Sequence, residues 1–183
     1  FCLLDESRGT KKFGDFEIFE KWITSTETNQ LDLKLTVWNN LMKNNRRHNQ
    51  GEFITKPDVA EFIAQFIGEN KFNRVLDPAC GIGYLLSRVI SNCGAKEIHG
   101  IEINPKIYST AKKLHKNFNI QNSDSCFADL SDNEYDLIIS ELPLGLRVSP
   151  FTSDWLDFKI TDVSYGIMAN SLKHLSAKGT AIF

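Results

Sequence analysis

Short apolar strands alternate with helices over most of this chain, and this alternation constrains the fold more than any other feature. From Gly51 onward the pattern first predicts an amphipathic helix ended by Gly68, with apolar positions at Val59, Phe62, Ile63, Phe66 and Ile67. Strands are then expected at residues 74–77, 97–103, near 125–128 and at 135–140, and helices at 84–93, 105–118 and 163–175, before a closing strand from residue 179. This order indicates an α/β fold with a parallel sheet, helices on both faces and ligands at the carboxyl ends of the strands.

The first 50 residues have a different character. Phe16, Phe19, Trp22 and Ile23 fall at helical spacing, as do apolar residues between Leu31 and Met42. Residues 43–50 are polar and locally basic, which is typical of a linker. We therefore expect an N-terminal helical region with a polar linker at 1–50 and an α/β domain at 51–183. The chain starts at Phe1 and stops within its closing strand, so we expect a fragment of a longer protein whose domain is incomplete at the C-terminal end.

Composition excludes several classes of protein. The 183 residues carry 21 Lys and Arg against 23 Asp and Glu, so no global positive field draws the chain to nucleic acid or to a membrane. The four cysteines form no CxxC pair and have no His at zinc spacing, which argues against a metal site or a disulfide framework. No apolar run approaches the roughly 18 residues of a membrane helix, and no secretory signal is visible. The expectation is a reduced, cytoplasmic protein without metal or membrane contact.

The sharpest motif is the turn at residues 77–83, Asp-Pro-Ala-Cys-Gly-Ile-Gly, where the first strand meets a helix. Two glycines there let the backbone approach a ligand, and the amides at the helix start favour an anionic group. A dinucleotide fingerprint would need a third glycine where Leu86 stands, so NAD is disfavoured. Glu102 ends the second strand 19 residues after Gly83, where a carboxylate can accept from both ribose hydroxyls.

This turn, together with IEINP at residues 101–105 and GEFITKPDVAEFI at 51–63, resembles the N6-adenine DNA methyltransferases, which depend on S-adenosylmethionine. The chain is most similar to the methylation subunit of type I restriction-modification systems and its relatives, over about residues 51–183. The resemblance implies a Rossmann-like class I methyltransferase fold and DNA as substrate. DNA would be bound weakly by this chain, or through another domain or a specificity subunit of a restriction-modification system.

The resemblance also implies which residues would bind S-adenosylmethionine. Asp77, Gly81 and Gly83 would line its methionine part, and Glu102 its ribose. Asp129, after the expected third strand, would accept from the adenine amino group, and Phe53 and Thr55 would contact the two ends of the cofactor. Lys56 stands between Thr55 and Pro57, whereas the family has Thr directly followed by Pro. The remaining expected cofactor contacts are Pro78, Ala79, Ile103 and Leu130.

The catalytic segment departs further from the family pattern. In the family the fourth strand runs into Asn (or Asp or Ser)-Pro-Pro-Tyr (or Phe), whose first side chain and next carbonyl accept from the target amine while the aromatic ring stacks on a flipped-out base. Here the corresponding residues are Glu141, Leu142, Pro143 and Leu144. Glu141 keeps an acceptor and Leu142 keeps its carbonyl, but Leu144 offers no aromatic face.

Three functions are therefore compatible with the sequence. The first is methyl transfer from S-adenosylmethionine to adenine N6 in DNA. The second is a catalytically degenerate subunit that binds cofactor or partners, for which the altered residues 141–144 are the evidence. The third is methylation of RNA or of a protein amide, because related tetrapeptides act on other planar amines.

Overall fold

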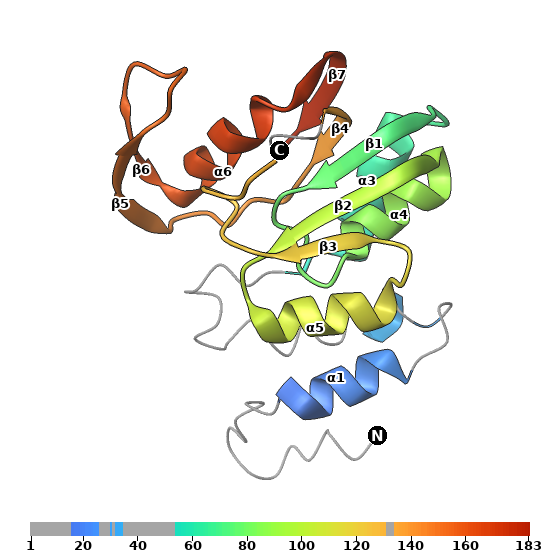
Figure 1. Cartoon of the computed structure of the whole chain (residues 1–183). Helices are drawn as coiled ribbons and strands as arrows, with labels where there is room; N and C mark the ends of the chain where they lie inside the picture. Colours follow the sequence, from blue (N-terminus) through green and yellow to red (C-terminus); the bar gives the residue numbers. More distant parts are fainter. Residues whose placement is uncertain (1–15, 26–29, 31, 35–53, 131–133) are drawn as a thin grey trace.

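The computed structural model describes residues 16–25, 30, 32–34, 54–130 and 134–183, and the side chains from residue 20 onward. Its centre is a sheet of five parallel strands in the order β3-β2-β1-β4-β7 (Figure 1). The strands are β1 (Phe72–Asp77), β2 (Ala95–Glu102), β3 (Asn119–Asn122), β4 (Tyr135–Ile139) and β7 (Leu175–Ile182). The expected Rossmann-like parallel sheet is confirmed, and its strand order reverses between β1 and β4.

Side chains that alternate along β1 and β4 fill a core on each face of the sheet. Val75 and Leu137 point into a cluster with residues of α3 (Pro57–Ile67), α4 (Tyr84–Cys93) and α5 (Pro105–Leu114). Leu76 and Ile138, one residue further along each strand, pack on the other face against Ala128 and Leu130. Because both faces are covered here, the buried residues Val75 and Leu76 of β1 and Leu137 to Ile139 of β4 form continuous apolar runs, as in buried parallel strands.

The described N-terminal residues pack on the α/β domain. Helix α1 (Phe16–Thr24) confirms the predicted helical spacing, and its Ile23 is fully buried in the same cluster as Val75. Glu20 accepts hydrogen bonds from Thr110 (3.2 Å) and Lys113 (2.8 Å) of α5. Lys113 lowers the pKa of Glu20. The linker predicted at residues 43–50 lies outside the described residues, so the boundary at residue 51 stays a prediction.

The strand expected near residues 125–128 is wrong, because β3 ends at Asn122. Residues 126–130 alternate between buried and exposed side chains, as a strand does, but they lie over the second face of the sheet without joining it. Asn170 of α6 (Val163–Leu172) donates to the carbonyls of Ser125 (3.0 Å) and Ala128 (2.9 Å) and fixes this segment. The alternation of apolar side chains in this segment therefore results from their burial against the sheet, and not from pairing with a neighbouring strand.

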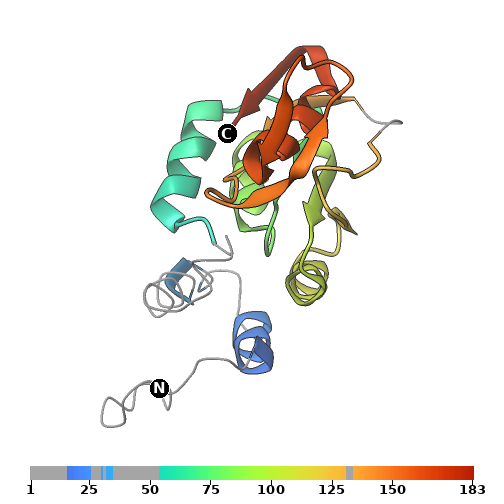
Figure 2. The same ribbon diagram turned by 90° about the vertical axis from the view of Figure 1, so that its left-hand side faces the viewer.

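Other boundaries differ in smaller ways. The helices predicted at 105–118 and 163–175 end earlier, at Leu114 and Leu172. A region expected to be loop contains an antiparallel hairpin, β5 (Arg147–Thr152) with β6 (Lys159–Asp162), which lies near the start of α6 (Figure 2). Helix α3 is present as predicted, but it buries Ala60, Ala64 and Ile67, while Phe62 and Phe66 are exposed. No helix among the described residues is long and apolar enough to cross a membrane.

Candidate functional site

The candidate site lies at the carboxyl edge of the sheet, between β1 and β4, where the strand order reverses. Asp77 ends β1 and Ser140 follows β4. The Ser140 hydroxyl donates to Asp77 Oδ1 at 2.7 Å, and the Ala79 N–H donates to the same atom at 3.0 Å. Asp77 is only 2% exposed, and burial raises its pKa to about 7, with smaller contributions from the negative charges of Glu102 and Glu141. A buried carboxyl with a raised pKa is therefore held by two hydrogen bonds at the point where the strand order reverses.

The glycine turn that follows Asp77 requires its glycines. Gly81 and Gly83 have φ angles of 54° and 78°, which residues other than glycine rarely adopt. A Cβ on Gly83 would lie 2.7 Å from Cδ2 of His115, a residue at the end of α5. His115 Nε2 lies 3.0 Å from the Ile82 carbonyl oxygen, and burial lowers the His115 pKa, so a neutral imidazole supports the turn from behind.

Gly83→Ala should destabilise the fold by about 2–4 kcal/mol, because left-handed strain of about 1–2 kcal/mol adds to overpacking against His115. In a His115→Ala background the same substitution should cost only the strain. Urea unfolding of the four variants in this double-mutant cycle measures the coupling. Additive costs would show that His115 does not restrict residue 83.

A pocket opens beside Asp77 and the turn. Its lining comes from the segment before α3, from the turn, from the start of α4 and from the residue after Ser140: Ile54, Thr55, Asp77, Ala79, Cys80, Gly81, Ile82, Tyr84, Leu85 and Glu141. Cys80 is not a nucleophile here, since burial raises the pKa of its thiol well above the usual value. The structure thus brings together four expected cofactor residues, Thr55, Asp77, Ala79 and Gly81, and one expected catalytic residue, Glu141.

The other described cofactor residues that the sequence predicted do not line this pocket. Pro78 is buried, and its carbonyl accepts from the Ser125 hydroxyl. Glu102 is buried at the end of β2, where its Oε1 accepts from the Asn104 N–H at 2.6 Å, and Ile103 beside it is 65% exposed. Phe53 lies outside the described residues.

Asp129 and Leu130 are not next to the third strand, because that strand ends earlier than expected. Asp129 is exposed, and Leu130 is buried in the cluster that contains Leu76 and Ile138. The carboxylate that directly follows β3 is Asp124, whose Oδ1 accepts from the Cys126 N–H at 2.9 Å. Carboxylates therefore stand at or just after the ends of three neighbouring strands: Asp77, Glu102 and Asp124.

The expected catalytic residues form the turn after β4. Glu141 is exposed and lines the pocket, and Leu142 and Pro143 are half-buried. The Ser164 hydroxyl at the start of α6 donates to the Pro143 carbonyl at 2.9 Å, which fixes the turn. Leu144 is 77% exposed. An acceptor thus faces the pocket, while an aliphatic side chain faces solvent where the family has an aromatic ring.

Sequence reasoning did not single out five lining residues, Ile54, Cys80, Ile82, Tyr84 and Leu85, nor Ser140 and Asp124. Tyr84 lines the pocket, and Ser140 donates a hydrogen bond to the pocket residue Asp77. Tyr84 directly follows the glycine turn and Ser140 directly precedes the expected catalytic residues, so extending each motif by one residue would have found both. Asp124 was not predicted, because the alternating pattern at residues 126–130 suggested a strand there and so pointed to Asp129 as the carboxylate after it. Among the described residues, no cluster of three or more His, Cys, Asp or Glu side chains could hold a metal ion.

Comparison with known proteins supports a methyltransferase-like chain. The family described as "Methyltransferase domain" matches residues 75–157. The type II methyltransferase M.CvrRI of Paramecium bursaria Chlorella virus XZ-6E is 28% identical over 108 residues, which cover 59% of this chain and 28% of that protein. The chain therefore spans less than a third of this curated relative.

Two solved structures share the fold. The methyltransferase subunit of a type I restriction-modification system from Streptococcus thermophilus has a TM-score of 0.60 and 22% identity, covering 72% of this chain and 34% of that one. A Listeria monocytogenes protein described as a class I S-adenosylmethionine-dependent methyltransferase has a TM-score of 0.63 and 17% identity, covering 91% and 54%. The fold is that of the class I methyltransferases. Together with the family match, these findings support S-adenosylmethionine as the cofactor.

Proposed function

We propose that this chain is the cofactor-binding part of a DNA methyltransferase that transfers a methyl group from S-adenosylmethionine to adenine N6. The observation that carries the proposal is the series of carboxylates at or just after the ends of β1, β2 and β3, of which Asp77 lines a pocket together with the glycine turn and Glu141. The relatives that match include a viral type II methyltransferase and a type I restriction-modification subunit. A substrate in DNA, and partner subunits of a restriction-modification system, agree with the second of these names.

The cofactor residues follow from the geometry of the pocket. Asp77, Thr55 and the turn at Gly81 would hold the methionine end, because they line the same pocket. Glu102 would accept from the ribose hydroxyls at the end of the next strand. For the adenine we favour Asp124 over Asp129, since Asp124 lies two residues after the end of β3, and Ile103, which is 65% exposed, offers an apolar surface at the end of the neighbouring strand β2. The cofactor supplies the electrophilic methyl group, and its sulfonium charge is stabilised by nearby carboxylates.

The acceptor side consists of Glu141 and Leu142. The Glu141 carboxylate and the Leu142 carbonyl would accept hydrogen bonds from the target amine and align its lone pair with the methyl group. The hydrogen bond from Ser164 to the Pro143 carbonyl holds this turn in place. Sequence recognition would depend on another segment or subunit, because the net charge of −2 gives the chain no general affinity for DNA.

Methyl transfer from radiolabelled cofactor tests the proposal. The protein, with any neighbouring specificity subunit, should transfer label to unmethylated duplex DNA in low salt, and digestion should recover it as N6-methyladenine. A duplex of the same sequence already methylated at every adenine is the matched control and should accept no label. Label recovered on cytosine, or equal labelling of both duplexes, would contradict adenine N6 as the acceptor.

A second candidate function is a subunit that binds S-adenosylmethionine without transferring its methyl group. The 77% exposed Leu144, in place of an aromatic ring, is the observation that favours it. Cofactor binding measured by calorimetry, without methyl transfer to any duplex, would support this candidate over the first.

A further inference from the structure

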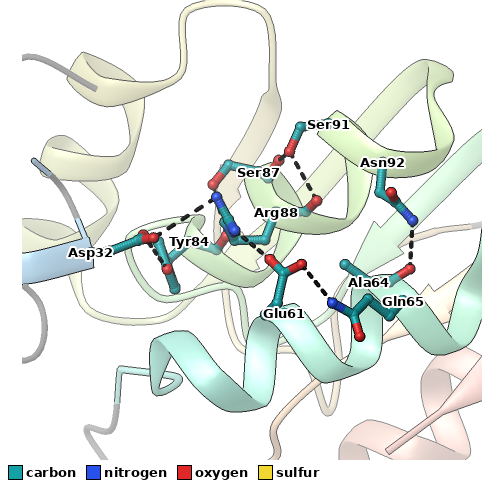
Figure 3. Close-up of polar contacts among 9 residues, drawn as sticks. All are labelled: Asp32, Glu61, Ala64, Gln65, Tyr84, Ser87, Arg88, Ser91 and Asn92. Atoms are coloured by element: carbon teal, nitrogen blue, oxygen red, sulfur yellow. Dashed lines mark hydrogen bonds and ion pairs between the residues drawn. The ribbon is translucent and has the colours of Figure 1, made fainter. Parts of the chain in front are cut away.

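Arg88 of α4 joins three segments that are distant in the sequence (Figure 3). Its Nη2 donates to Glu61 Oε2 of α3, and its Nη1 lies 3.9 Å from Asp32 Oδ2. Asp32 Oδ1 in turn accepts from the Tyr84 hydroxyl, one turn before Arg88 on α4. We call Asp32, Glu61, Tyr84 and Arg88 the Arg88 network.

The Arg88 network lies directly behind the candidate cofactor pocket. Tyr84 is 2% exposed and lines the pocket, so the hydrogen bond to Asp32 is made by a pocket residue. Helix α3 begins at Pro57, two residues after Thr55, and both Ile54 and Thr55 line the pocket. Fixing Glu61 on α3 therefore also restrains the lining segment that enters this helix.

Charge balance makes Arg88 the centre of the network. Two carboxylates, Asp32 and Glu61, approach one guanidinium. Arg88 lowers the pKa of Glu61, which keeps that carboxyl ionised. Without the guanidinium, the two carboxylates would lose their shared partner and repel each other, which would loosen the contacts of Asp32 and Glu61 with α4.

We propose that Arg88 is a positioning residue that holds the methionine end of the cofactor pocket in shape, and that residues 32–34 support it from outside the pocket through Asp32. The inference rests on the proposed function, because it assumes S-adenosylmethionine in this pocket. It concerns the methionine end specifically, since the pocket is lined by Thr55, Asp77 and Tyr84 but not by Glu102 or Ile103. The network thus connects the N-terminal region to cofactor binding.

Binding of two different ligands distinguishes a positioning role of Arg88 from a general contribution of Arg88 to the stability of the fold. S-adenosylhomocysteine carries the amino-acid part, and 5′-methylthioadenosine lacks it. By calorimetry, Arg88→Met should weaken S-adenosylhomocysteine binding by about tenfold or more but change methylthioadenosine binding by less than about threefold. The matched control is Arg74→Met, which removes an ion pair to Glu97 (2.7 Å) on strands β1 and β2 and should change neither affinity.

Tyr84→Phe provides an independent test that removes only one hydroxyl. It should weaken S-adenosylhomocysteine by about threefold to tenfold, with the same selectivity between ligands. Equal weakening of both ligands by Arg88→Met, or unchanged S-adenosylhomocysteine affinity in Tyr84→Phe, would overturn the inference. If the wild-type protein bound neither ligand, the proposed function itself would fail.

Discussion

Asp77→Asn should make the protein more stable at neutral pH while weakening its affinity for S-adenosylmethionine. The carboxyl is 2% exposed, and burial raises its pKa from 3.8 to about 7. An asparagine keeps an oxygen that can accept from Ser140 and Ala79, at present 2.7 and 3.0 Å from Asp77 Oδ1. The substitution therefore removes the buried charge and retains the hydrogen bonds.

The sign of the pH dependence follows from proton binding. Between about pH 4 and 7 the unfolded chain has lost the Asp77 proton, whereas the folded protein still holds it. The folded state binds more protons there, so the contribution of Asp77 to the free energy of unfolding falls as pH rises and levels off above pH 7. At about 1.4 kcal/mol per pH unit, Asp77→Asn should gain up to about 4 kcal/mol over the wild type above pH 7 and almost nothing near pH 4.

The cost of this substitution should appear in binding. Loss of a charged acceptor for the cationic methionine end should reduce cofactor affinity by about tenfold to a hundredfold, as measured by calorimetry at pH 8. Asp136→Asn is the matched control, because Asp136 likewise accepts two hydrogen bonds, from the backbone N–H groups of Asn73 (2.7 Å) and Arg74 (3.1 Å), but at the opposite end of the strands. An Asp77→Asn protein that gained no stability at pH 8 and bound cofactor normally would refute the role of a buried, functional carboxylate.

The elements that the sequence predicted well are those bounded by residues with strong backbone preferences. Helix α4 runs from Tyr84 to Cys93 as expected, between Gly83 and Gly94, both at positive φ. Helix α5 starts at Pro105 behind Asn104, whose side chain accepts from the Lys106 N–H at 3.0 Å. Local backbone chemistry at these positions is enough to fix an element boundary without knowledge of the fold.

Elements that depend on distant partners were predicted less well. Strand β3 has a single buried residue, Ile120, and becomes a strand because β2 pairs with it. The buried face of α3 is set by α4, which packs against the small residues Ala60 and Ala64 and leaves Phe62 and Phe66 exposed. Hydrophobicity along the helix suggested the larger residues, so the choice of face required the tertiary contact.

The residues of the candidate site likewise fall into those that a local sequence motif predicts and those whose contacts depend on distant segments. Asp77 was predicted from the family motif and Glu102 from its spacing to Gly83, and the structure places each at the end of a strand, while their contacts with the cofactor stay predictions. The hydrogen bond between Tyr84 and Asp32 joins residues 52 positions apart, and no local pattern indicates it. Such a link between distant segments can be seen only in the structure, which here connects Asp32 to the pocket residue Tyr84.

Rebuilding the family tetrapeptide should raise methyl transfer more than any other change. Glu141→Asn combined with Leu142→Pro and Leu144→Tyr restores a shorter acceptor and an aromatic face. The side chain at 144 is 77% exposed, so a tyrosine ring meets no core residue there. Base stacking is worth about 1–3 kcal/mol, and correcting an acceptor misplaced by about 1 Å can recover about a hundredfold, so a total of about 4–6 kcal/mol is expected.

Glu141→Ala is the complementary variant. Because Glu141 faces the pocket and is the expected acceptor for the target amine, this variant should lose residual methyl transfer while Asp77, Glu102 and the glycine turn keep cofactor affinity within about threefold. Both variants should be assayed with labelled cofactor on unmethylated duplex DNA, with affinity for S-adenosylhomocysteine measured in parallel. If the wild type and the rebuilt protein both bind cofactor and neither transfers label, the defect cannot lie in residues 141–144 alone, and the non-catalytic subunit becomes the better account of this chain.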